Sequence, residues 1–283
     1  MSSSSFSHHP HSGFIDLTHG IILRGTGYLT GASWGRRAIN TASRSAAFAM
    51  TVFHLKQITV HSAHRVAGAI RWNYDRAELI ADGIVHGLGV FAGLIALTVL
   101  IVLTAVFATA YEVVSVSIYA AGVLAMLGFS AAYNMWPVSP RKWFLRRFDH
   151  SAIYLLIAAT YTPFLAQMEN ARLAVALLAF VWGVAAAGIV VKLRYPGRFD
   201  GLAVVLYLAL GWSGLMAYDA VFTPLPPLTM WFIAAGGTLY TLGVIFHVWH
   251  RLRFQNAIWH GFVLCGAACH YTAVLDMVLS TSA

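Results

Sequence analysis

Four pairs of polar residues stand out in a chain that is otherwise strongly apolar. They are Asp82 with His86, Ser130 with Asn134, Asp149 with His150, and Asn256 with His260. Glu78 extends the first pair toward the N-terminus with the same spacing of four residues. Carboxylate, imidazole and hydroxyl groups can exchange protons, hold a metal ion or bind a polar headgroup. These residues are therefore the candidate functional groups of the protein.

Each of these residues also has a structural alternative. Acidic residues such as Asp82 and Asp149 often cap helix N-termini, and a serine such as Ser130 often bonds to its own helix. His270, ten residues after His260, is expected to be a hydrogen-bonded core residue. The functional interpretation therefore depends on whether the pairs meet in space.

The composition indicates that the elements carrying these pairs lie in a membrane. Of 283 residues, 59% are hydrophobic and only 10% are charged. Between Asp82 and Asp276 the charged residues delimit seven charge-free intervals, each 18 to 31 residues long: 83–111, 113–140, 150–168, 173–191, 201–218, 220–250 and 254–275. A membrane-spanning helix needs about 20 apolar residues, whereas a β-barrel shows alternating segments of about 10. The sequence predicts an all-α bundle of seven transmembrane helices.

The basic residues predict how the chain threads through the membrane. Strict alternation from a cytoplasmic N-terminus places 17 of the 18 Lys and Arg residues on the cytoplasmic side, with Arg172 as the exception. Because basic residues favour that side, we expect the N-terminus to be cytoplasmic and the C-terminus external. The net charge of +8 then needs only anionic membrane lipid as its partner. No nucleic-acid partner is expected.

This threading brings the four pairs to similar depth, near the cytoplasmic ends of the first, second, third and seventh spans. We therefore predict one polar chamber that opens toward the cytoplasm. Its expected ligand-binding residues are Glu78, Asp82, His86, Asn134, His150 and Asn256, and its candidate catalytic residues are Ser130 and Asp149.

Residues 1–74 form a separate unit, which we interpret as a basic, low-complexity cytoplasmic leader. It contains no charge-free run longer than 15 residues, so no span fits there, and it lacks the pattern of a cleaved signal peptide. Residues 45–55 could form a helix on the inner membrane face. Disorder and an overextended translation start are the alternatives. The membrane domain is expected to comprise residues 75–283.

Four stretches of the chain resemble the haemolysin III branch of the progestin and adipoQ receptor superfamily. They are residues 77–89, 148–164, 236–243 and 258–270, the second of which reads Phe-Asp-His-Ser-Ala-Ile-Tyr-Leu-Leu-Ile-Ala-Ala-Thr-Tyr-Thr-Pro-Phe. The resemblance spans residues 75–280 and leaves the leader outside it. It implies a seven-helix bundle with the N-terminus inside, in a multi-pass protein of the bacterial inner or plasma membrane type.

The resemblance also implies a zinc site at the cytoplasmic end. Family members of this kind carry a histidine four residues after a serine in the second helix and a His-x-x-x-His pair opening the seventh, with an aspartate that holds the metal-bound water. Ser130, Asp149 and His260 match this pattern, so His260 and Asp149 are the candidate metal residues. Asn134 and Asn256 stand where the other two histidines are expected. Because amides lack the basic lone pair of imidazole, zinc binding is weakened.

Three functions remain open at this point. The favoured one is a metal-free membrane protein without a cofactor, whose chamber binds a lipid headgroup or another small molecule in a receptor or regulatory role. The second is a zinc-dependent hydrolase of a lipid amide, as in the related ceramidases, with zinc as cofactor. The third is a pore-forming cytolysin, as the name of the branch suggests. The oligomeric state and the identity of the ligand are not predicted.

Overall fold

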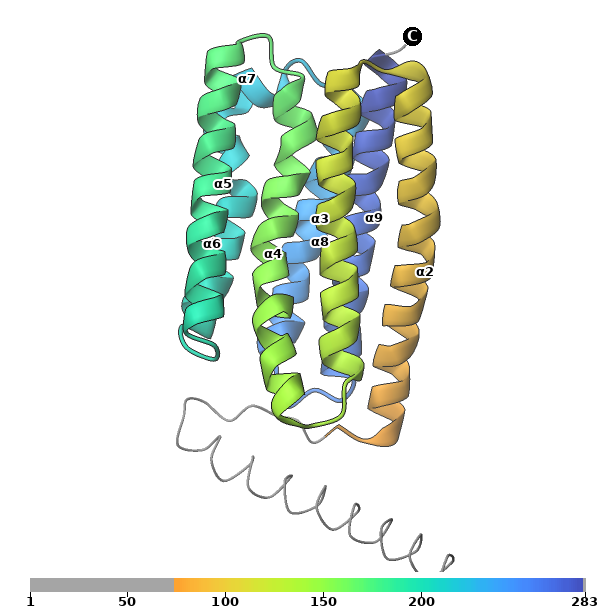
Figure 1. Cartoon of the computed structure of the whole chain (residues 1–283), viewed down its shortest axis with the longest axis vertical. Coiled ribbons are helices and arrows are strands. Elements are labelled where there is room, and N and C mark those ends of the chain that lie inside the picture. Colours follow the sequence, from red (N-terminus) through yellow and green to blue (C-terminus); the bar gives the residue numbers. More distant parts are fainter. Residues whose placement is uncertain (1–73, 282–283) are drawn as a thin grey trace, which may run out of the picture. The chain divides into compact units, whose positions relative to one another are not determined.

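The computed structural model describes residues 74–281, which are helical and contain no strand. The predicted leader, including the proposed helix at 45–55, lies outside the described residues. The elements are α2 (Arg76–Phe107), α3 (Ala110–Met135), α4 (Pro140–Ala166), α5 (Ala171–Arg194), α6 (Asp200–Trp212), η1 (Ser213–Ala217), α7 (Tyr218–Phe222), α8 (Pro227–Val248) and α9 (Gln255–Thr281). The long helices run alongside one another as a bundle (Figure 1).

Six segments of the described chain are long and apolar enough to cross a membrane: α2, α3, α5, α8, α9 and the combined segment Asp200–Val221. The seventh, α4, is 27 residues long, but charged residues occupy half of its first ten positions: Arg141, Lys142, Arg146, Arg147 and Asp149. These charges shorten its apolar stretch and explain why it differs from the others. The predicted all-α membrane architecture is confirmed, and α4 brings the number of crossings to seven.

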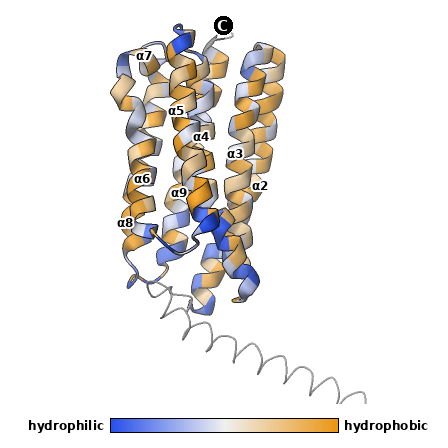
Figure 2. Ribbon diagram, turned by 60° about the vertical axis from the view of Figure 1, so that its left-hand side comes forward, coloured by the Kyte–Doolittle hydropathy of each residue, from blue (hydrophilic) through white to orange (hydrophobic). Residues whose placement is uncertain are grey.

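The two ends of the bundle differ in charge. The start of α2 and the connections 136–139, 195–199 and 249–254 lie at one end, which we call the basic end. Among the described residues, every Lys and Arg except Arg172 lies at or near this end. The helix midsections are mostly hydrophobic (Figure 2). This distribution agrees with the partition of charge expected for a membrane protein.

The helices pack in a sequence of neighbours, α2 on α3, α3 on α4, α4 on α5 and α8 on α9, and α2 also packs on α9. Glycines allow the closest of these contacts. A Cβ atom at Gly266 of α9 would come within 3.0 Å of the Tyr240 ring of α8. Outward-facing side chains such as Ile84 and Phe91 are exposed, as expected where lipid covers a helix. The segment α6 packs less extensively on its neighbours than α4 does.

The fifth crossing is not one continuous helix, because α6 gives way to the 3₁₀ turn η1 at Ser213. Tyr161 of α4 provides partners for the backbone groups that this break frees. Its hydroxyl lies 2.8 Å from the Gly211 carbonyl oxygen, to which it donates, and accepts the Gly214 N–H at 2.8 Å. Irregular backbone at membrane depth is tolerated only where it finds such partners. The break is therefore fixed by α4.

Candidate functional site

Asp82 lies at the centre of a hydrogen-bonded network at the basic end. Its carboxylate accepts a hydrogen bond from His260 Nδ1 at 2.7 Å and another from Asn256 Nδ2 at 2.7 Å. Because Asn256 and His260 are four residues apart, they lie on one face of α9. Only 5% of the Asp82 side chain is exposed. The two bonds therefore join the first and last membrane helices out of reach of water.

His86 extends this network to α3. Its Nδ1 lies 2.8 Å from the Asp82 carbonyl oxygen, which can only accept, so Nδ1 carries the hydrogen. Nε2 is then an acceptor, and it lies 3.2 Å from the Ser130 hydroxyl. The rings of His86 and His260 meet edge to face, with centroids 4.3 Å apart. The hydrogen bond between Ser130 and His86 therefore joins α3 to α2.

Asn134 completes the network. Asn256 Nδ2 donates to Asn134 Oδ1 at 3.1 Å, and Asn134 Nδ2 donates to the Ser130 carbonyl oxygen at 3.0 Å. Lys142 Nζ donates to the Asn134 and Trp136 carbonyl oxygens, both at 2.9 Å. A cation at the C-terminal end of a helix, as here for α3, is favourable. The group Asp82, His86, Ser130, Asn134, Asn256 and His260 is called the Asp82 network below.

Asp149 and His150 have different surroundings, because consecutive residues point about 100° apart around a helix. Asp149 interacts with Ser130 and His260 and thus lies beside the Asp82 network. His150 faces the other way, with Nδ1 3.9 Å from Asp200 Oδ1. The helix-capping alternatives do not apply, since the N-caps of α2 and α4 are other residues and both acidic groups lie inside their helices.

Glu78, which was expected in the polar chamber, connects the start of α2 to the segment before α9. Its carboxylate accepts hydrogen bonds from the backbone N–H groups of Asp75 at 2.8 Å and Phe254 at 3.0 Å. Asp75 caps α2 by accepting the Glu78 N–H at 2.8 Å. This bond lowers the pKa of the Asp75 carboxyl, and the nearby Arg253 guanidinium lowers it further. These contacts form a capping box that holds two chain segments together.

A second polar group at the basic end was not expected from the sequence. Asp200, the first residue of α6, accepts hydrogen bonds from Arg146 Nη2 at 2.6 Å and Lys192 Nζ at 2.7 Å. The two cationic side chains are buried, with 8% and 3% exposure, while the Asp200 side chain is 40% exposed. With His150 these residues form what we call the Asp200 cluster. It joins α4, α5 and α6, and no short-range spacing in the sequence could have revealed it.

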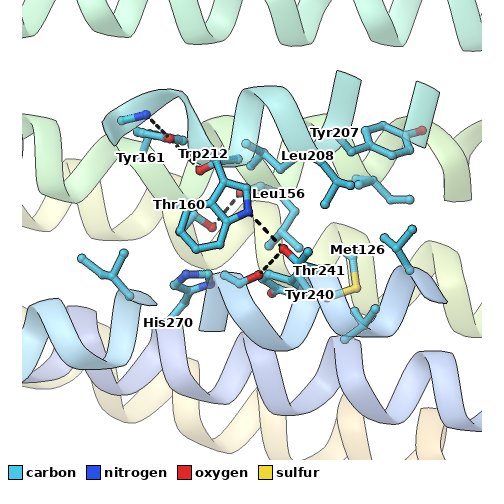
Figure 3. Close-up of a pocket in the computed structure, with 18 of the residues that line it drawn as sticks. Met126, Leu156, Thr160, Tyr161, Tyr207, Leu208, Trp212, Tyr240, Thr241 and His270 are labelled. Carbon is cyan, nitrogen blue, oxygen red and sulfur yellow. Dashed lines mark hydrogen bonds between the residues drawn. The ribbon is translucent and has the colours of Figure 1, made fainter. Parts of the chain in front are cut away.

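A cavity of about 550 Å³ adjoins both polar groups. Its walls come from α3, α4, α6, η1, α7, α8 and α9, and most of the lining side chains are apolar. Asp149 and His260 line it at the basic end, and Tyr218 and Trp231 line it toward the other end. Figure 3 shows part of its wall, including residues of α4, α6, α8 and α9. Ligand pockets have volumes of about 300–1,000 Å³, so this cavity is large enough for a lipid-like molecule.

The structure divides the predicted site residues into two sets. Ser130, Asp149, His150 and His260 line the cavity. The others, Glu78, Asp82, His86, Asn134 and Asn256, are not among its lining residues. The first helix was expected to help build the chamber, but α2 contributes its polar residues to the supporting network and none to the wall.

The fold and this site define a multi-pass α-helical membrane protein whose bundle encloses a mostly apolar cavity with a polar end. The family model described as Haemolysin-III related matches residues 77–271. The chain belongs to this family, the haemolysin III branch of the progestin and adipoQ receptor superfamily.

The chain is similar to several curated proteins. It is 38% identical to a hemolysin-3 homolog of Bacillus subtilis (strain 168) over 198 residues, which are 70% of this chain and 93% of that protein. It is 37% identical to hemolysin-3 of Bacillus cereus over 205 residues, or 72% and 94%. The human monocyte to macrophage differentiation factor is 31% identical over 172 residues, or 58% and 70%. No solved structure matches the chain.

The donors at the expected zinc positions do not fit zinc. The amides of Asn134 and Asn256 bond to each other, and Asn256 Nδ2 also donates to Asp82. These groups present hydrogens where a metal ligand needs a lone pair. Asp82, His86 and His260 could offer ligand atoms within 4.8 Å of one another. The Nδ1 atoms of both rings, however, are already engaged by oxygen atoms of Asp82.

Proposed function

We propose that this haemolysin III-type protein binds a single-chain amphiphile from the membrane and acts in a receptor or regulatory role without a metal ion. The observation that carries this proposal is a cavity whose wall is polar at one end and apolar along most of its length. Ser130, Asp149 and His260 line its basic end, and apolar side chains line most of the remainder. An amphiphile matches that division, with its headgroup at the polar end and its chain along the apolar wall.

The hydrogen-bond roles at the polar end favour a headgroup that donates. His260 Nδ1 donates to Asp82, so Nε2 is left as an acceptor. The Ser130 hydroxyl gives its hydrogen to His86 and accepts one from Asn134 Nδ2 at 3.4 Å, which leaves it one lone pair, and an ionised Asp149 can only accept. A headgroup with N–H or O–H groups, such as an amide or an alcohol, would satisfy these acceptors better than a carboxylate.

The test is binding of N-octadecanoyl ethanolamine, which carries both an N–H and an O–H group, to the purified full-length protein. Ala234 and Ala235 are adjacent and exposed on α8, but only Ala234 lines the cavity. Ala234→Trp should fill the cavity and weaken binding at least tenfold, while Ala235→Trp should bind like the parent. Native mass spectrometry would measure both. Equal binding by the two variants would mean that the lipid sits outside the cavity.

A zinc-dependent lipid amide hydrolase is the second candidate, favoured by the proximity of Asp82, His86 and His260. Elemental analysis of the purified protein distinguishes it, since stoichiometric zinc would contradict the metal-free proposal. Asn134→His combined with Asn256→His should restore the expected donors. Structural zinc sites are worth on the order of 10 kcal/mol, so the double variant should show a zinc-dependent rise in Tm that the parent lacks.

We also propose that the basic end faces the cytoplasm, because lysine and arginine favour that side of a membrane. A reporter fused after Ala283 should then be external, and one inserted between Ser139 and Arg141 should be internal. Opposite readings at both positions would reverse the orientation and place the polar end of the cavity outside.

A further inference from the structure

Polar side chains also occur partway along the cavity, away from the basic end. They come from α4, α6, α8 and α9 and are Thr160, Tyr161, Trp212, Tyr240, Thr241 and His270 (Figure 3). His270 follows His260 by ten residues on α9. At a rise of 1.5 Å per residue, this places it about 15 Å further along the helix axis. That is about half the thickness of the hydrocarbon core.

Most of this polar capacity is already used within the protein. Tyr161 bonds to the broken backbone between α6 and η1. Trp212 Nε1 donates to Thr241 Oγ1 at 3.0 Å, and Thr241 Oγ1 donates to the Gly237 carbonyl oxygen at 2.8 Å. These groups hold α4, α6 and α8 in place and do not need a ligand.

His270 is the exception. Its Nδ1 is buried and has no hydrogen-bond partner among the described residues. His270 bonds to the backbone of Ile233, and because Nδ1 has no partner we assign that bond to Nε2, so the expectation that this histidine is a hydrogen-bonded core residue holds for only one of its nitrogens. That contact favours a hydrogen on Nε2, which leaves Nδ1 as an acceptor. A buried acceptor without a donor is destabilising.

The position of the His270 ring is fixed by its neighbours. It stacks on Tyr240 with ring centroids 5.4 Å apart. On the other helix Gly236 leaves room for it, because a Cβ atom there would lie 3.0 Å from two atoms of the ring. Thr160 Oγ1 also lines the cavity and gives its own hydrogen to the Leu156 carbonyl oxygen at 2.8 Å. The free capacity of both His270 and Thr160 is thus for accepting hydrogen bonds.

We infer that His270 forms a second polar subsite, which binds a hydroxyl group located partway along the ligand's acyl chain. The inference rests on the proposed function, because it requires an amphiphile with its headgroup at His260. An extended chain advances about 1.3 Å per carbon, so about 15 Å corresponds to roughly twelve carbons. A hydroxyl fits because it donates. A keto oxygen would face another acceptor and does not fit.

The test compares three lipids that share one headgroup: N-octadecanoyl ethanolamine, its 12-hydroxy derivative and its 12-oxo derivative. The 12-hydroxy lipid should bind the full-length protein about three- to tenfold more tightly than the unsubstituted lipid, which is the typical net effect of one hydrogen bond. The 12-oxo lipid should gain nothing. If none of the lipids binds, the proposed function fails. If all three bind equally, the cavity holds a lipid but His270 is satisfied by water, and the subsite is refuted.

Variants at position 270 test whether the preference for the 12-hydroxy lipid depends on His270 Nδ1. His270→Leu should remove the preference for the hydroxyl, whereas His270→Asn, which keeps an acceptor near the Nδ1 position, should retain part of it. The matched control is His247→Leu, because His247 also lines the cavity with a buried, unpartnered Nδ1 but lies at the basic end. Its preference ratio should equal that of the parent.

A further variant guards against a folding defect at position 270. Gly236→Ala keeps the imidazole but adds a Cβ atom 3.0 Å from the ring and 3.0 Å from the Gly266 carbonyl oxygen, so its Tm must be measured beside the parent's. The ring or the α9 backbone beside it must shift, so the preference for the 12-hydroxy lipid should fall while binding of the unsubstituted lipid persists. An unchanged ratio in both Gly236→Ala and His270→Leu would overturn the assignment.

Discussion

The Asp82 network and the Asp200 cluster lie at the same end of the bundle, and each is organised around one carboxylate with two donors. The Asp82 side chain is 5% exposed and bonds to an amide and an imidazole. The Asp200 side chain is 40% exposed and bonds to two cations. Water can therefore replace a lost partner of Asp200 but not one of Asp82. The Asp82 network depends on every bond, whereas the Asp200 cluster combines two buried cations with a carboxylate that water can reach.

This difference also bears on the expected metal site. In the Asp82 network, Asn134 and Asn256 connect helices through amide hydrogen bonds. Each amide can donate and accept, so two of them can satisfy a carboxylate and each other without a cation. In the Asp200 cluster the carboxylate is instead neutralised by the positive charges of Arg146 and Lys192. If the comparison is right, three of the carboxylates at this end, Asp82, Asp200 and Asp75, should differ in importance according to their exposure.

The largest effect is expected for Asp82→Ala. The substitution leaves the His260 N–H and the Asn256 amide buried without an acceptor, and breaking a buried pair costs about 3–5 kcal/mol. The Tm in detergent should fall by about 10 °C. The control is Asp219→Ala, because Asp219 is exposed in α7 at the opposite end. If both variants melt at the same temperature, the Asp82 network does not stabilise the bundle.

A smaller effect is expected for Asp200→Asn. It removes the negative charge between the buried Arg146 and Lys192 side chains, but water reaches the 40% exposed Asp200 side chain and asparagine still accepts a hydrogen bond, so the loss should be about 1–2 kcal/mol. Thermal unfolding of Asp200→Asn, Arg146→Gln and the double variant would measure the coupling between the two residues. A coupling near zero would show that the ion pair is only a surface contact. A loss as large as that of Asp82→Ala would remove the distinction between the two regions.

Most of the helices could be predicted from the sequence because of where the charged residues lie. Charged residues mark the ends of apolar runs, so the helices could be located without any knowledge of their packing. The break after Trp212 could not be predicted, because it depends on Tyr161, which is about 50 residues away in the sequence. The charged first part of α4 was also placed outside the predicted span at 150–168, although it continues the same helix from Pro140.

The candidate site was predictable where helical periodicity applies. The spacing of four placed Asn256 and His260 on one face of α9, and the structure shows both bonded to Asp82. The same spacing puts Glu78 on the buried face of α2 with Asp82 and His86, but a capping box at the helix start engages its carboxylate, so it does not line the cavity. The Asp200 cluster depends on contacts among three helices, so no local pattern indicates it. The functional roles of all these residues stay predictions.

The smallest effect of the three is expected at Asp75, whose side chain is 50% exposed and lies 3.2 Å from Arg253. Asp75→Asn keeps an N-cap of similar quality and loses only an exposed ion pair, so its Tm at neutral pH should stay within about 1 °C of the parent. Asp75→Ala should melt lower than Asp75→Asn, because alanine cannot accept the Glu78 N–H.

The lowered pKa of Asp75 predicts how the Tm difference between Asp75→Asn and the parent changes with pH. Because folding lowers the pKa of Asp75 below its ordinary value of 3.8, its contribution to stability is present above that value and is lost as the pH falls through the folded pKa. The Tm of Asp75→Asn should therefore show slightly less acid dependence below about pH 4 than that of the parent. Thermal melts of the two proteins from pH 7 to pH 3 would measure the difference. A Tm loss for Asp75→Asn at neutral pH as large as that of Asp200→Asn would show that exposure does not rank the three carboxylates.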